Sequence, residues 1–184
     1  MTRPEAPNGR FSGCAIIYRG GLEVAIVLVR IDDRLIHGQV VGGWLPVIQA
    51  GRVVVVSDRA AADALQTGLM RMAVPDGVTV DVLTVAQAVP LLKKEAWGSE
   101  RVLLLLPGLQ ELVVLVDAGV EFAHVNLGGL HDAPGRSMVA AHLAFSADER
   151  ALLVRLINKG IRFETRPLPG DVPVPLKELI PGLR

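Results

Sequence analysis

The amino-acid sequence predicts an α/β protein with an open, mostly parallel twisted sheet and helices on both faces. Short apolar runs alternate along the chain with segments of helical period, which is the pattern of consecutive β–α units. The run at residues 24–31 is β-branched and almost wholly apolar, as in strands that a parallel sheet buries on both faces. Apolar residues make up 51% of the 184 residues, enough for one well-packed core.

The net charge and the cysteine content argue against several classes of protein. Lys plus Arg and Asp plus Glu both number 19, so no net charge favours a nucleic-acid or anionic-membrane partner. The one cysteine, Cys14, has no partner for an internal disulfide, and no cysteine cluster indicates zinc. We expect a cytosolic protein without a transmembrane segment of its own.

The chain divides into a short leader and one domain. Prolines and glycines interrupt any period in residues 1–23, which we expect to be a disordered leader or a wrongly assigned start, with a docking arm as the alternative. Residues 24–184 contain no linker, repeat or low-complexity block, so we expect them to form a single domain.

The elements of the first half follow in order. After the strand at 24–31, apolar residues from Val40 onward predict a helix that begins near Gly38. Residues 53–56 predict a buried strand, and Ser57 with Asp58 caps the next helix. The apolar positions of that helix are interpreted as its core face, with methionine as filler, and are Ala62, Leu65, Leu69, Met72 and Ala73. A strand over 78–83 and a helix over 85–97 complete this half, with Trp97 interpreted as packing.

The second half repeats the alternation. The predicted strands are 101–106, 122–127, 142–145 and 161–166. The predicted helices are 109–118, a helix opened by the capping box of Ser146 and Glu149, and a short helix over 174–180. A glycine-rich loop follows residue 127, so two predicted strands end in loops with polar groups.

A charged loop follows the first strand, at the edge where parallel sheets collect ligands. It carries Arg30, Asp32, Asp33 and Arg34, and His37 follows at the predicted helix start. The free N–H groups and the positive dipole end of a helix start favour an anion, and arginine forks match phosphate oxygens. An imidazole at this place can bind beside a phosphoryl group or accept one.

Each charged residue of this loop has a structural alternative to a functional role. Arg30 and Arg34 either form ion pairs on a solvated loop, worth less than about 1 kcal/mol, or clamp phosphoryl oxygens, and Arg34 is the better placed. Either Asp32 or Asp33 can hold the imidazole through a hydrogen bond and fix its tautomer.

Further residues extend this candidate site. Gln39 and the backbone of Gly38 complete the predicted phosphate cradle, and Trp44 is interpreted as packing at its border. Of the other histidines, His124 lies inside an apolar strand and is interpreted as a core residue, and His142 is interpreted as structural. His131 either lines the site or lies in an exposed turn. The position of each relative to His37 depends on the fold.

The run Arg30 to Val40 (RIDDRLIHGQV), with Trp44 after it, resembles the active-site signature of the enzyme IIB component of the mannose/fructose/sorbose family of the bacterial phosphoenolpyruvate-dependent sugar phosphotransferase system. The asparagine and glycines of residues 126–129 also resemble a segment of this family. One departure is Gly42-Gly43, where many relatives carry polar or basic residues. That departure bears on partner contacts and leaves the His37 motif intact.

The resemblance implies a mostly parallel seven-stranded sheet with an antiparallel portion near its end. It also implies that His37 carries a phosphoryl group, which it accepts from a phosphohistidine on IIA and gives to a sugar held by the IIC and IID membrane components. This is the activity of a protein-N(pi)-phosphohistidine–sugar phosphotransferase, which requires no metal or organic cofactor. The resemblance favours Asp32 as the residue that orients the ring, and it implies a cytoplasmic protein peripherally associated with its transporter.

Two other functions compete with this interpretation. In a regulatory phosphoprotein, His37 is still phosphorylated, but the output is binding to another protein and not sugar transport. A nucleotide-binding domain is disfavoured because neither G-x-G-x-x-G nor G-x-x-x-x-G-K-[ST] follows the first strand. A homodimer is compatible with the sequence, although no residue pattern locates its interface.

Overall fold

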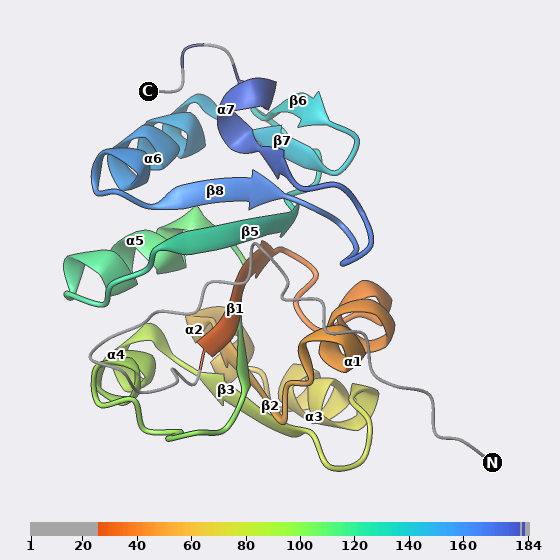
Figure 1. The fold of residues 1–184 in the computed structure, drawn as a ribbon. Coiled ribbons are helices and arrows are strands. Elements are labelled where there is room, and N and C mark those ends of the chain that lie inside the picture. Colours follow the sequence, from red (N-terminus) through yellow and green to blue (C-terminus); the bar gives the residue numbers. More distant parts are fainter. Residues whose placement is uncertain (1–25, 181, 183–184) are drawn as a thin grey trace.

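The computed structural model describes residues 26–180 and 182, and its main feature is a seven-stranded sheet of order β3-β2-β4-β1-β5-β8-β9 (Figure 1). The strands are β1 (Ile26–Asp32), β2 (Arg52–Val56), β3 (Thr79–Leu83), β4 (Val102–Leu106), β5 (His124–Gly129), β8 (Arg162–Thr165) and β9 (Val174–Pro175). Neighbours pair in parallel except β8 and β9, which are antiparallel. The open, mostly parallel sheet with an antiparallel portion near its end is therefore confirmed.

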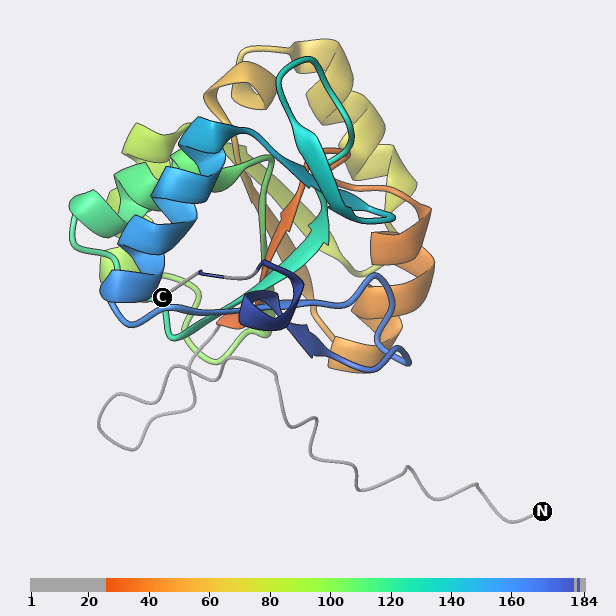
Figure 2. The same cartoon turned by 90° about the horizontal axis from the view of Figure 1, so that it is seen from above.

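Helices cover both faces of the sheet (Figure 2). The first face packs against α4 (Val85–Lys93), α5 (Leu109–Asp117) and α6 (Ala147–Asn158). The second packs against η1 (Gln39–Trp44), α1 (Leu45–Ile48), α2 (Asp58–Ala61) and α3 (Ala64–Ala73). In β4, residues 102, 104 and 106 join the first core and residues 103 and 105 the second, because successive side chains of a strand point to opposite faces.

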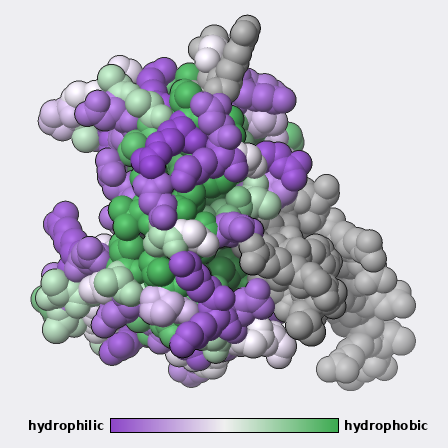
Figure 3. All heavy atoms as spheres, turned by 90° about the vertical axis from the view of Figure 1, so that its left-hand side faces the viewer, coloured by the Kyte–Doolittle hydropathy of each residue, from purple (hydrophilic) through white to green (hydrophobic). Residues whose placement is uncertain are grey.

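The surface on the side of α4, α5 and α6 has hydrophobic residues between polar rims (Figure 3). Within residues 26–180 and 182, no helix combines the length and the apolar character that crossing a membrane requires.

β1 is the middle strand, and the chain leaves it toward β2 on one side and later crosses to β5 on the other. Ligand crevices of open α/β sheets form at the carboxyl ends of strands where the winding direction changes in this way. The segment after β1 therefore lies at the topologically favoured edge.

The helix predicted after His37 is present but irregular. Its first part, η1, is a six-residue π-helix, and α1 continues it for four residues. His37 O accepts hydrogen bonds from both Val40 N and Val41 N, at 2.9 Å each. Pro46 in α1 has no N–H to donate to the carbonyl of Gly42, so a regular α-helical bond is impossible at that place. Hydrophobic spacing alone could not distinguish the two kinds of helix.

The interpretation of the helix after β2 is wrong in two respects. Asp63 interrupts it and caps a new helix, α3, through its carboxylate and Gln66 N. The five apolar residues predicted to form a core face are all exposed instead, and Met72 is 84% exposed. Met70, at 6% exposure, is the residue that α3 contributes to the core. The break between α2 and α3 rotates the second part, so its inward face changes.

Several other boundaries differ from the prediction. The helix predicted over 85–97 ends as α4 at Lys93, and Trp97 packs against the core as expected. β5 continues through the glycines of the predicted loop. A hairpin of β6 (Ser137–Ala140) and β7 (Leu143–Phe145) lies outside the main sheet, and the sequence pattern does not predict its first strand. The final helix, α7 (Leu176–Leu179), is preceded by the short strand β9.

The predicted helix caps are confirmed. Ser57 Oγ accepts a hydrogen bond from Ala60 N, and Ser146 and Glu149 form the reciprocal capping box that opens α6. The leader predicted over residues 1–23, including Cys14, lies outside the described residues.

The two methionines of α3 provide a test of its orientation. We expect Met70→Ala to lower the free energy of unfolding by about 2–5 kcal/mol, because it removes a buried side chain and leaves a cavity. Met72→Ala in the same helix should change it by less than about 0.5 kcal/mol. Urea unfolding followed by circular dichroism measures both, and a larger loss for Met72→Ala would contradict this orientation.

A second matched pair tests the packing of β5 against β1. A Cβ at Gly128 would overlap the guanidinium of Arg30, so we expect Gly128→Ala to destabilise the fold by at least about 1–3 kcal/mol. At Gly42 in η1 nothing lies within 4 Å of the place that a Cβ would take, and Gly42→Ala should leave stability unchanged or raise it by up to about 1 kcal/mol. Equal unfolding free energies for the two variants would refute this account of Gly128.

Candidate functional site

The candidate site lies beyond the carboxyl ends of β1 and β5. All seven residues of β1 are buried, so the strand carries its last charged side chains from the core to the edge of the sheet. β5 pairs with β1 in parallel and ends beside it. The loops that follow the two strands therefore meet, and residues from the two loops come into contact although they lie far apart in the sequence.

Arg30 is fully buried in the middle strand, whereas the sequence alone left a solvated ion pair and a phosphate clamp as its alternatives. Its Nη1 donates to Asn126 Oδ1 at 2.6 Å and to Arg166 O at 3.1 Å, and its Nη2 donates to Asp32 Oδ2 at 2.9 Å. Burial lowers the pKa of Arg30, and the charge of Asp32 opposes that effect. These contacts hold the guanidinium behind the loop, within the sheet.

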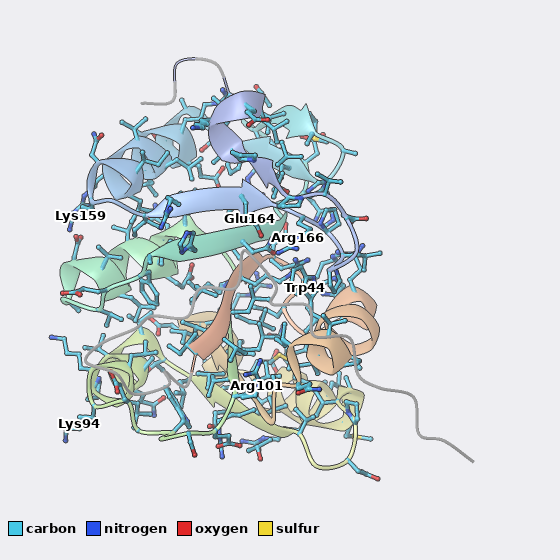
Figure 4. The ribbon with its side chains drawn as sticks, in the orientation of Figure 1. Trp44, Lys94, Arg101, Lys159, Glu164 and Arg166 are labelled. Atoms are coloured by element: carbon cyan, nitrogen blue, oxygen red, sulfur yellow. The ribbon has the colours of Figure 1, made fainter. Side chains whose placement is uncertain are left out.

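Trp44 completes the surroundings of Arg30. Its ring is buried and lies 5.4 Å from the Arg30 Cζ and 5.2 Å from the Arg166 Cζ, and its Nε1 donates to Pro167 O at 2.9 Å. Trp44, Arg166 and Glu164 come together where η1 meets the segment after β8 (Figure 4). The interpretation of Trp44 as packing is confirmed, with cation–π contacts as part of that packing.

Asp32 links this buried cluster to His37. Its side chain is fully buried, and its Oδ2 accepts from Arg30 while lying 3.7 Å from His37 Nε2. Its Oδ1 accepts a hydrogen bond from the backbone N–H of Arg34 at 3.2 Å. The guanidinium of Arg30 thus fixes the Asp32 carboxylate, and the same carboxylate faces the His37 ring.

The His37 ring is held on two sides by oxygen atoms. Nδ1 lies 2.9 Å from Leu35 O, and because a carbonyl only accepts, Nδ1 carries the proton in this arrangement. Nε2 lies 3.3 Å from Gln39 Oε1 as well as near Asp32. Leu35 is buried and adopts a left-handed conformation with φ 55°, which directs its carbonyl toward the ring. The side chain of His37 is 16% exposed.

The remaining predicted site residues lie on the solvent side of His37. The side chain of Arg34 is 42% exposed, its Nη2 donates to Gln39 Oε1 at 2.7 Å, and its Nε lies 3.5 Å from Asp32 Oδ1. Gly38 is exposed to solvent, and no atom lies within 4 Å of the position that a Cβ would take there. The backbone at the start of η1 is therefore open to approach.

Asp33 points to a different partner. Its Oδ2 accepts from His131 N at 2.8 Å, and its Oδ1 lies 2.6 Å from His131 Nδ1. Of the two aspartates that were candidates to orient His37, only Asp32 lies near that ring. His131 belongs to the same edge of the sheet, where it lies in the loop after β5.

The other two histidines have structural surroundings. His142 Nε2 lies 2.6 Å from Thr165 Oγ1, whose hydroxyl donates to Leu127 O. Burial and then the charge of Arg30 lower the pKa of His142. His124 begins β5 and is half-buried and not within the core, so its assignment as a core residue is wrong in degree.

Three residues of the site have roles that the sequence alone did not predict. Asn126 Oδ1 and Arg166 O accept from Arg30, and Glu164 Oε1 accepts from Asn126 Nδ2 at 3.3 Å and from Arg166 Nη2 at 3.1 Å. One signal was available: each lies at the end of a predicted parallel strand, where polar residues of different strands gather. In the described part of the chain, no three His, Cys, Asp or Glu residues are grouped in a way that could hold a metal ion.

Residues 26–182 match the family described as the PTS system sorbose subfamily IIB component. The sorbose-specific EIIB component of Klebsiella pneumoniae is 30% identical over 155 residues, which cover 84% of this chain and 94% of that protein. The mannose-specific EIIAB component of Escherichia coli (strain K12) is 36% identical over 159 residues, which cover 85% of this chain. The chain spans about half, 49%, of the length of that relative.

Solved structures share the fold as well as the sequence. The crystal structure of the IIBSor domain of the sorbose permease from Klebsiella pneumoniae has a TM-score of 0.79 and 29% identity, and the match covers 85% of this chain and 96% of that domain. The N-acetylgalactosamine-specific IIB component 1 from Escherichia coli has a TM-score of 0.76 and 28% identity, over 81% and 97% of the two chains. The chain therefore belongs to the sorbose subfamily of PTS IIB components, which are phosphotransferases of sugar transport.

Proposed function

We propose that this chain is a phosphocarrier in which His37 accepts a phosphoryl group from a IIA phosphohistidine and passes it to a sugar held by IIC and IID membrane components. One observation carries the proposal: an imidazole is held between opposing oxygen atoms at a helix start that is open to approach. Such a ring is oriented by its neighbours, as nucleophilic catalysis requires.

The transfer exchanges one N–P bond for another. Acceptance on N(pi), which is Nδ1, requires that Nδ1 leave Leu35 O and that the ring proton move to Nε2, where Asp32 and Gln39 present oxygens. The Nδ1 lone pair then forms a bond to phosphorus while the bond to the IIA nitrogen breaks, and that nitrogen takes back its electron pair. Attack by a sugar hydroxyl on the same phosphorus then breaks the N–P bond, whose electron pair returns to Nδ1. The hydroxyl proton passes to Nδ1 as Nε2 releases its own proton, which returns His37 to its starting form.

Arg34 and the start of η1 are suited to the charge of the phosphoryl group. The Arg34 side chain is partly exposed and lies within contact of Gln39 and Asp32, so a small movement brings its donors toward a group on His37. The backbone N–H groups at Gly38 and Gln39 open the helix and carry its positive end. Positioned donors of this kind supply most of the catalysis in phosphoryl transfer.

Arg30 has a different role in this proposal from the one that its charge suggested. Its Nη1 and Nη2 donate to Asn126, Arg166 O and Asp32, and its Nε is buried, so it positions the carboxylate and does not contact the phosphoryl group. Asp32 in turn orients the His37 ring and stabilises its positive charge during transfer.

The partners and location follow from this role. We propose a IIA protein or domain as donor, a IIC/IID pair as destination and a position at the cytoplasmic side of the membrane. The relative from Escherichia coli is named as an EIIAB component, and this chain aligns with about half of it, which supports a IIA protein or domain as the donor. No metal or organic cofactor enters the exchange, because the phosphoryl group travels as a covalent phosphoramidate.

The first test is phosphorylation of the purified chain by phosphoenolpyruvate, the general phosphotransferase proteins and a matching IIA. We expect one acid-labile adduct of phosphate mass at residue 37 of the parent chain and a large loss of total phosphate label in His37→Ala, measured by peptide mapping and intact mass. His124→Ala is the control, because that ring lies half-buried at the opposite end of β5. If His37→Ala is labelled by IIA as strongly as the parent, His37 is not the acceptor.

Arginine variants test the clamp. We expect Arg34→Gln to slow transfer from IIA on the order of a hundredfold, since it removes a charged donor beside His37. Arg155→Gln is the matched control: Arg155 is 49% exposed and pairs with Asp117, on the face of the sheet opposite η1. Stopped reactions resolved by phosphate-affinity electrophoresis give both rates. Equal rates for the two variants would remove Arg34 from the mechanism.

A further inference from the structure

His131 has the arrangement of a second imidazole nucleophile. Its Nδ1 lies 2.6 Å from Asp33 Oδ1, and its backbone N–H donates to Asp33 Oδ2 at 2.8 Å. A carboxylate only accepts hydrogen bonds, so Nδ1 carries the ring proton and Nε2 of the neutral ring holds the lone pair. The side chain is 45% exposed, and no residue among 26–180 and 182 makes a hydrogen bond to Nε2.

The surrounding loop fixes this pair in place. Arg136 Nη1 donates to His131 O at 2.8 Å and lies 3.9 Å from Asp33 Oδ2. The other side of the same guanidinium forms two hydrogen bonds to Glu149, at 2.6 and 3.0 Å. The dyad of Asp33 and His131 is therefore attached to the start of α6 and does not depend on a single surface contact.

The dyad also adjoins the His37 site. A Cβ at Gly129 would lie 3.2 Å from His131 Cε1 and 3.3 Å from Asp32 Oδ1. The ring and the carboxylate that faces His37 thus border the same point on the backbone of β5. An incoming donor at this edge of the sheet meets both imidazoles.

We propose that His131 is a second phosphoryl acceptor, whose donor is an N-phosphorylated imidazole or amine. The chemical class of the donor is taken from the proposed function, and in that respect this proposal rests on it. The Nε2 lone pair forms the new N–P bond, and the donor's N–P bond breaks with its electron pair returning to the donor nitrogen. Nδ1 keeps its proton against Asp33, so the step requires no separate base.

The other histidines show why His131 stands out. His142 donates through Nε2 to Thr165 Oγ1, because the threonine proton is given to Leu127 O, so that nitrogen has no lone pair to offer in this arrangement. His124 is half-buried, and no carboxylate lies within ion-pairing distance of its ring among the described residues. Both serve as internal references.

The experiment treats the full chain with phosphoramidate, a small donor that needs no partner protein, and locates the acid-labile phosphate by peptide mass spectrometry. We expect label at His131 as well as at His37, with His131 labelled at least about tenfold faster than His124 or His142, which have no charge-assisted hydrogen bond to a carboxylate among the described residues. Asp33→Asn should lower the ratio of label at His131 to label at His124 by about tenfold, because the amide no longer accepts with a full charge.

Two results would overturn the proposal. One is a His131 labelled no faster than His124, and the other is a labelling ratio that Asp33→Asn leaves unchanged in a variant whose thermal unfolding shows an intact fold. Label at His37 and transfer from IIA are recorded separately. Loss of His131 label with His37 label intact rejects this inference alone, whereas unlabelled His37 in the IIA reaction rejects the proposed function.

Discussion

The buried ion pair between Arg30 and Asp32 is the interaction on which the site depends. Both side chains have no exposed surface, and burying two charges is costly unless they are paired and hydrogen-bonded. Asn126 and Arg166 O accept from Nη1 of Arg30, and its Nε has no partner among the described residues. Removal of one member of such a pair costs about 3–5 kcal/mol, since the other is left uncompensated. Arg30, in the middle strand of the sheet, therefore holds the Asp32 carboxylate in place.

Close backbone packing makes room for this pair. Gly128 on β5 lies against the Arg30 guanidinium, and a side chain there would occupy the same space. Gly43 has a similar role on the other side: a Cβ would come within 3.0 Å of Leu168 Cδ2, so the glycine lets the segment after β8 approach η1. Gly42 beside it has free space. The unusual Gly42-Gly43 pair thus has a packing reason at its second position.

The fold was predictable where one segment contains its own signal. β4 is apolar throughout and is buried on both faces, and the Ser146–Glu149 capping box opens α6 as its sequence indicates. The prediction failed for the helix after β2. Leu65 and Met72 have helical spacing, yet the cap at Asp63 turns that face to solvent. Spacing shows that a helix has an apolar face, but only the packed fold shows which face is inside.

The candidate site likewise combines contacts that the sequence predicts with contacts that only the fold shows. His37, Gln39 and Arg34 lie within one loop, so their proximity follows from the sequence once a strand and a helix start are located. The contacts of Arg30 with Asn126 and with the Arg166 carbonyl join residues 96 and 136 positions apart in the chain. No local pattern encodes these pairs. Parallel pairing predicted that such strand ends would meet, without specifying which side chains would bond.

The two adjacent aspartates, Asp32 and Asp33, contact two different imidazoles. Asp32 is the last residue of β1, whereas Asp33 begins a turn that the hydrogen bond from Leu35 N to Asp32 O closes at 3.0 Å. The change from strand to turn between the two residues gives their side chains different partners. Asp32 therefore turns toward Arg30 and His37, and Asp33 turns toward His131. A strand end followed at once by a turn can therefore orient two imidazoles with two adjacent carboxylates, because the chain changes direction between them.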